Sequence, residues 1–145
     1  MKKKTYKKKG YVKCELLEDI GLKPHQYGTN FCDKSDKQWG KWRKQRKKNG
    51  FDERETWCMD FMFYQWLYTR LTMYKKKAKK IVDLTFYKFQ YTPSDTEIPI
   101  EVTQKTAIDI VRNEAKRMIL SDDDTEVFDK NIMNLFYDLL PHLWW

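Results

Sequence analysis

The sequence predicts a mainly α-helical protein, a single helical bundle organised around one long amphipathic helix. Hydrophobic residues make up 41% and aromatic residues 16% of the 145 residues, enough to build the core of one domain. Apolar residues recur at the helical period over residues 52–82 and again after residue 104. Strand-like alternation is confined to residues 84–102, where it predicts a small β-hairpin.

The first third of the chain carries the surplus positive charge. Residues 1–50 hold 16 Lys and Arg against 5 Asp and Glu, whereas the whole chain has a net charge of +8. Residues 1–10 predict a flexible basic arm, and residues 11–145 a single helical domain. Within it, residues 11–22 predict a short helix that stops at Gly21, and residues 24–36 a loop.

The stretch from Trp39 to Lys48, W-G-K-W-R-K-Q-R-K-K, is the strongest candidate for binding, and Gly50 ends it as a helix cap. Lys and Arg neutralise phosphates, and Trp offers a face on which a base can stack. The candidate ligand contacts are Trp39, Lys41, Trp42, Arg43, Arg46 and Lys47. Arg43 and Arg46 are spaced to reach one phosphate. The alternative is a solvated basic helix whose tryptophans pack onto the core.

The long helix over residues 52–82 begins at Asp52, which forms a capping-box pattern with Glu55. One broad face is apolar, and five lysines fall on the opposite side: Lys75, Lys76, Lys77, Lys79 and Lys80. A second apolar line follows the helix: Met59, Met62, Trp66 and Met73. A helix that is apolar on two sides is central in its bundle or contacts another subunit. We favour the central position and leave a homo-oligomer open.

Asp60 projects onto the main apolar face of this helix, between Trp57, Tyr64 and Leu67. A buried, unpaired carboxylate costs several kcal/mol, so the side chain needs a partner or stays protonated. We favour a structural hydrogen-bond acceptor, with a ligand-reading or acidic role as the alternative.

The remaining elements follow from alternation and periodicity. The hairpin pairs the run around Phe89 with the run around Val102, and Pro99 restricts the second run to an edge. A helix over residues 104–120 buries Ala107, Ile108, Val111, Ala115, Met118 and Ile119. Ser121 and Asp124 predict the cap of a last helix. For the acidic run 122–124 we favour helix capping over metal binding. This helix buries Val127, Phe128, Ile132, Leu135, Phe136 and Leu139. Pro141 ends it, and Leu143, Trp144 and Trp145 either fold back or form an exposed patch.

The sequence offers little that supports an enzyme, a metal site or a cofactor. It contains no glycine-rich phosphate loop, no His-Glu metal helix and no nucleophile-histidine set, and we predict none of these functions. Cys14, Cys32 and Cys58 are too widely spaced for a zinc motif and predict reduced thiols. No apolar run is long enough to span a membrane, and no secretory signal is present, so we predict a cytoplasmic protein.

The segment G-F-D-E-R-E-T-W-C-M-D, residues 50–60, together with a C-terminal Leu-Trp, resembles a family of small phage and prophage proteins. The match covers about half the chain and is carried by Arg54, Trp57 and Asp60, which therefore join the candidate ligand-binding residues. The basic segment is not part of that pattern. No activity is assigned to the family, so the resemblance implies a non-catalytic viral accessory protein in a host bacterial cell, with interference in host defence as its natural role.

Two functions follow as hypotheses. In the first, the protein binds an anionic ligand, nucleic acid or a nucleotide signal, through its basic, Trp-bearing segment. In the second, it is a protein-interaction module that blocks a host defence enzyme by occlusion, through its acidic C-terminal half or its Trp tail.

Overall fold

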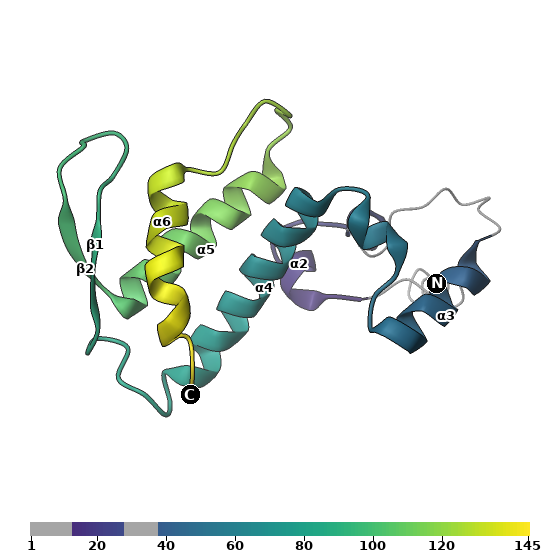
Figure 1. The fold of residues 1–145 in the computed structure, drawn as a ribbon, viewed down its shortest axis with the longest axis horizontal. Helices are drawn as coiled ribbons and strands as arrows, with labels where there is room; N and C mark the ends of the chain where they lie inside the picture. Colours follow the sequence, from purple (N-terminus) through teal and green to yellow (C-terminus); the bar gives the residue numbers. More distant parts are fainter. Residues whose placement is uncertain (1–12, 28–37) are drawn as a thin grey trace. The chain divides into compact units, whose positions relative to one another are not determined.

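The computed structural model describes residues 13–27 and 38–145. As predicted, the described chain is mainly helical with one small antiparallel hairpin (Figure 1). It divides into two compact units, residues 1–65 and 66–145. The predicted arm, residues 1–10, and most of the predicted loop lie outside the described residues. The single helical domain stays a prediction.

In the first unit, the predicted 11–22 helix is a single turn, α2 (Glu15–Glu18). The turn that follows it closes at Gly21, which adopts a left-handed φ of 93° and lets the amide of Leu22 bond the carbonyl of Leu17 at 3.0 Å. The Tyr27 hydroxyl donates to the Cys14 carbonyl at 3.0 Å, so the chain after α2 folds back onto its start. A short 3₁₀ turn, η1 (Pro24–Gln26), lies between them.

The basic segment forms α3 (Trp39–Asn49) and ends as predicted at Gly50. Gly50 has a φ of 83°, and its amide bonds the carbonyl of Arg46 at 2.9 Å. Few residues other than glycine adopt this conformation without strain, which explains why the helix stops there.

The predicted 52–82 helix is shorter at both ends. Residues 53–56 form a separate 3₁₀ turn, η3 (Glu53–Thr56), and α4 (Met59–Ala78) begins after it. Asp52 is a cap as predicted, but it caps η3, because its carboxylate accepts from the Arg54 amide at 3.0 Å. At the other end, the Asp83 carboxylate accepts from the amide and hydroxyl of Thr85 and starts a turn.

In the second unit, β1 (Lys88–Tyr91) and β2 (Ile100–Thr103) pair antiparallel, which confirms the predicted hairpin. Phe89 lies opposite Val102, and both side chains are buried. The amides of Gln104 and Lys105 then bond the carbonyls of Tyr87 and Leu84, so the hairpin leads directly into α5 (Gln104–Leu120). Every residue predicted as buried in this helix is buried.

The last helix, α6 (Lys130–Leu139), starts later than predicted. The Ser121–Asp124 cap is wrong: Asp129 caps the helix by accepting from the amides of Asn131 and Ile132 at 2.8 and 3.1 Å. Asp123, in the acidic run, instead forms a turn, in which its carboxylate accepts from the amide and hydroxyl of Thr125. Val127 therefore lies before the helix and is 74% exposed, not buried as predicted.

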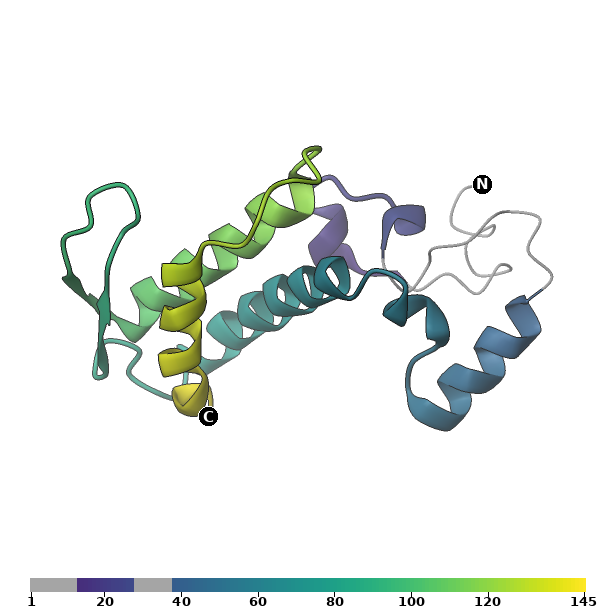
Figure 2. The same cartoon turned by 45° about the horizontal axis from the view of Figure 1, so that its top comes forward.

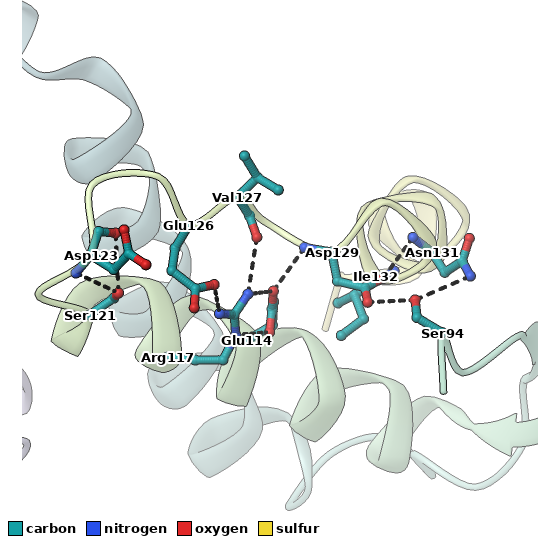
Figure 3. A network of polar contacts seen from close by, with 10 residues as sticks. All are labelled: Ser94, Glu114, Arg117, Ser121, Asp123, Glu126, Val127, Asp129, Asn131 and Ile132. Carbon is teal, nitrogen blue, oxygen red and sulfur yellow. Dashed lines mark hydrogen bonds and ion pairs between the residues drawn. The ribbon is translucent and has the colours of Figure 1, made fainter. Parts of the chain in front are cut away.

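A polar network fixes the connection between α5 and α6 (Figure 3). The buried Glu114 carboxylate accepts from Arg117 at 2.7 and 2.9 Å and from the Asp129 amide at 2.8 Å. Arg117 also bonds Glu126 and the Val127 carbonyl. Burial alone would raise the pKa of the Glu114 carboxyl, but these hydrogen bonds outweigh it and lower the pKa. Charge-assisted hydrogen bonds thus hold the loop before α6.

Candidate basic site on α3

The inner face of α3 carries its aromatic residues. Trp42 is completely buried, and its indole N–H donates to Glu53 Oε1 at 3.0 Å. Its ring meets those of Trp39 and Trp57 edge to face, at centroid distances of 5.5 and 5.7 Å. Such pairs contribute about 0.5–1.5 kcal/mol each beyond burial, so Trp42 is the centre of packing between α3 and residues 51–57.

A buried ion pair lies beside this aromatic cluster. The Arg54 guanidinium bonds the Asp52 carboxylate through two parallel contacts of 2.8 and 2.7 Å, and both residues are inaccessible to solvent. The guanidinium carbon lies 4.5 Å from the centroid of the Trp42 ring. Arg46 completes the cluster from α3, with Nε 2.8 Å from Asp52 Oδ2. One carboxylate therefore holds two arginines from consecutive elements.

The electrostatics follow from these contacts. Burial, and then the neighbouring charge of Arg54, lower the pKa of the Arg46 guanidinium from its ordinary value. On the adjacent Glu53, the hydrogen bond from Lys41 and those from the Trp42 indole and Gln45 hold the pKa of the carboxyl below its usual range. The Glu53 carboxyl thus stays ionised, and its ion pair with Lys41 neutralises part of the positive charge of α3.

The predicted ligand contacts consequently fall into two groups. Trp42, Arg46 and Arg54 face inward and bind other residues of the same unit, so the structure contradicts base stacking on Trp42. Trp39 is partly buried against the same cluster, and Lys41 pairs with Glu53 at 3.0 Å. The predicted contacts that remain exposed are Lys41, Arg43, Lys47, Trp57 and Asp60.

The expected burial of Asp60 is also wrong. Because α4 begins at Met59, Asp60 lies in the first helical turn and is exposed. Its carboxylate accepts from the Cys58 thiol at 3.2 Å, and burial together with this bond raises the pKa of that thiol. A carboxylate is favourable at a helix N-terminus, so it needs no buried partner.

The second apolar line of α4 also differs from expectation, whereas Leu67, Leu71 and Ala78 on the main apolar face are buried as predicted. Met59, Trp66 and Met73 on the second line are all exposed, so this side of the helix is not central in a bundle. Lys75, expected on the solvent face, is partly buried and pairs with Asp109 at 2.6 Å. The homo-oligomer stays a prediction.

The outer face of α3 carries Lys44, Lys47 and Lys48, which we call the lysine face. All three are exposed, and none has an ion pair with another described residue. A shallow groove of about 580 Å³ follows this face along Gly40, Lys41, Lys44, Gln45, Lys48 and Asn49. At 100° per residue, the lysine face lies opposite Trp39, Trp42 and Arg46.

Sequence reasoning missed the pairing of Asp52 with Arg54 because it assigned Asp52 only a capping role. The missed signal is the spacing of the tryptophans and Arg46, which places them on one side of α3. Within residues 13–27 and 38–145, no three acidic, histidine or cysteine side chains gather as a metal site requires. Cys14 and Cys58 are free thiols, and Cys32 lies outside the described residues.

Comparison with known proteins yields no match: no family, no curated protein and no solved structure is significantly similar to the chain. Among the helices that the structure describes, none is both long and apolar enough to cross a membrane.

Proposed function

We propose that the protein binds nucleic acid without catalysis, through contacts between the lysine face of α3 and phosphates. The observation that carries this proposal is the division of α3 into a packed side and an unpaired basic side. The carboxylates of Asp52 and Glu53 engage Arg46, Arg54 and Lys41, and leave Lys44, Lys47 and Lys48 to an external anion.

The same arrangement favours backbone contacts over base stacking. Trp42 offers no free ring face to a ligand, whereas three lysines on one side of a helix meet phosphates without reading sequence. Each neutralised phosphate of duplex DNA contributes about 0.9 to the slope of log affinity against log salt. Three contacts contribute about 2.7, which corresponds to about a 40-fold loss of affinity between 50 and 200 mM salt.

The test compares two triple variants by fluorescence anisotropy with a labelled 20-base-pair DNA. In Lys44→Gln/Lys47→Gln/Lys48→Gln, affinity should fall and the salt slope should drop by about 2.7. The matched control is Lys76→Gln/Lys77→Gln/Lys80→Gln, which removes three exposed charges from the last turn of α4 and the turn after it. Equal losses in both variants would show attraction to net charge alone. An unchanged slope in the first variant would refute the proposal.

We propose further that this binding serves a phage accessory protein in the cytoplasm of a host bacterium, where it interferes with host defence. The support for this context is the resemblance of residues 50–60 and the C-terminal Leu-Trp to phage proteins.

A second candidate function is occlusion of a host enzyme. Two apolar side chains at the end of α6 favour it, because Tyr137 and Leu140 are both exposed. If inhibition of a defence enzyme survives the lysine-face variant but is lost in Tyr137→Ser/Leu140→Ser, the protein acts through this surface.

A further inference from the structure

A small pocket lies in the second unit, between the turn that follows α4 and the first turn of α5. It has a volume of about 250 Å³ and is lined by Lys75, Lys79, Val82, Asp83, Leu84, Thr85 and Lys105. In Figures 1 and 2, the chain after α4 passes the start of α5 before it enters β1. The pocket is smaller than the roughly 300–1,000 Å³ of sites that enclose a drug-sized ligand, so it suits a small molecule.

Hydrogen bonds and burial hold the pocket walls in place. The Lys105 amide donates to the Leu84 carbonyl at 2.9 Å, which fixes the start of α5 against the turn. The Asp83 carboxylate accepts from the Thr85 amide and hydroxyl at 2.9 and 2.6 Å and so closes the turn itself. The Leu84 side chain is only 5% exposed and anchors the turn in the core. The walls are therefore formed before a ligand binds.

The backbone amides in the first turn of α5 are already occupied. The Gln104 amide donates to the Tyr87 carbonyl at 3.1 Å, and the Thr106 amide donates to the Thr103 hydroxyl at 3.2 Å. With the Lys105 amide bonded to the turn, these three donors are not open to an anion, as they are at many helix N-termini. Recognition of a ligand in this pocket therefore falls to the lysine side chains.

One of the three pocket lysines, Lys75, is held by a carboxylate that it shares. Lys75 Nζ lies 2.6 Å from Asp109 Oδ1, and Arg112 Nη2 lies 3.8 Å from the same oxygen. The side chain of Lys75 is only 24% exposed, so this ion pair fixes its position in the wall. Because one carboxylate serves two cations, the cluster around Asp109 keeps one positive charge in excess.

The other two pocket lysines are open to a ligand. Lys79 and Lys105 are exposed, and neither has an ion pair with another residue in the described part of the chain. Asp83 is engaged by Thr85, whose hydrogen bonds lower the pKa of its carboxyl. The lining residues and their ion-pair partners thus comprise four cations and two carboxylates, which leaves two positive charges without a partner.

Two uncompensated charges favour an anion with two negative charges. A carboxylate or a phosphodiester carries one, whereas a phosphate monoester carries about 1.5 to 2 at pH 7 and offers three acceptor oxygens. The apolar side chains of Val82 and Leu84 line the same pocket and strengthen the attraction, because they lower the local dielectric. We infer that the second unit binds a small molecule through a dianionic phosphate group, which Lys79 and Lys105 contact. This site is separate from the lysine face of α3 and does not depend on it.

The test is a ¹H–¹⁵N NMR titration of the full chain at pH 8 with inorganic phosphate, glycerol 3-phosphate and dimethyl phosphate. The first two should shift the amides of residues 79–85 and 105 and saturate below about 10 mM, and the tighter of the two identifies the source of the phosphate group. Dimethyl phosphate has the same tetrahedral centre but one charge. It should bind about 10- to 150-fold more weakly, the factor for one hydrogen bond to a charged group.

Lys79→Gln/Lys105→Gln should weaken the binding of inorganic phosphate and glycerol 3-phosphate by about tenfold or more. The matched control is Lys116→Gln/Lys130→Gln, which removes two exposed lysines of the same unit that do not line the pocket. It should bind both probes as the unaltered protein does, and so should the lysine-face variant of α3. Circular dichroism checks that each variant is folded.

Four results would overturn the inference. They are an absence of saturable shifts at the pocket amides, normal binding by Lys79→Gln/Lys105→Gln, equal affinity for dimethyl phosphate and glycerol 3-phosphate, and binding to vesicles of phosphatidic acid without binding to either soluble phosphate. The last result would assign the pocket to a lipid surface instead of a small molecule.

Discussion

Replacing Asp52 with alanine removes the one carboxylate that holds both Arg46 and Arg54. In the native protein, Asp52 makes contacts of 2.7 and 2.8 Å with Arg54 and one of 2.8 Å with Arg46. Without it, two guanidinium groups lie close together beside a buried indole, and the Arg54 amide loses its cap. Breaking one side of a buried ion pair costs about 3–5 kcal/mol, so Asp52→Ala should destabilise the first unit by that amount.

The assay is urea unfolding of the full chain, with hydrogen exchange of the α3 amides to assign the loss to the first unit. Asp60→Ala is the matched control, because it removes an exposed carboxylate nearby and should change stability by less than about 1 kcal/mol. The double variant Asp52→Ala/Arg54→Met should recover part of the loss, since it removes one of the stranded charges. The reasoning is refuted if Asp52→Ala and Asp60→Ala lower stability equally.

Two further predictions concern glycine and pH. Gly50→Ala should destabilise the protein by about 1 kcal/mol, because Gly50 has a φ of 83°. Gly40→Ala, inside α3 with open space at its Cβ position, should stabilise it by about 0.5–1 kcal/mol. Thermal unfolding of both variants measures the difference, and equal effects would contradict the assigned end of α3. For Glu114, whose pKa is lowered in the folded state, the stabilisation is complete above the unfolded-state pKa of about 4.3 and is lost as pH falls through the lower folded-state pKa. Melting temperatures measured from pH 7 to pH 3 should therefore fall less steeply in Glu114→Gln, and parallel curves would show that Glu114 does not contribute.

The second unit was largely predictable because its elements follow simple periods. The 104–120 helix obeys the helical period, and each apolar residue predicted to be buried in it is buried; the strands around Phe89 and Val102 alternate as a hairpin should. The last helix was misplaced because two aspartates compete as its cap. Asp129 prevails over Asp124 because its carboxylate accepts from the Asn131 amide, while its own amide donates to the Glu114 carboxylate.

The candidate site was harder to predict because composition does not reveal which side of the helix packs against the rest of the protein. The 3₁₀ turn after Asp52 keeps the apolar pattern of a helix while it changes the backbone, so the start of α4 and the position of Asp60 were both misjudged. Cations and tryptophans are interspersed along α3. Which of them become buried depends on the surface of the same unit that contacts the helix. That surface is the buried pair of Asp52 and Arg54, whose side-chain geometry the residue pattern does not reveal.

The lengthwise division of α3 has an evolutionary consequence. Substitutions at Lys44, Lys47 or Lys48 change the charge of the exposed side of α3 at almost no cost in stability, because exposed positions tolerate exchange. Truncation of the buried Trp42 side chain, in contrast, destabilises the first unit itself. We therefore expect diverged sequences to retain Trp42 while the residues at positions 44, 47 and 48 vary in charge.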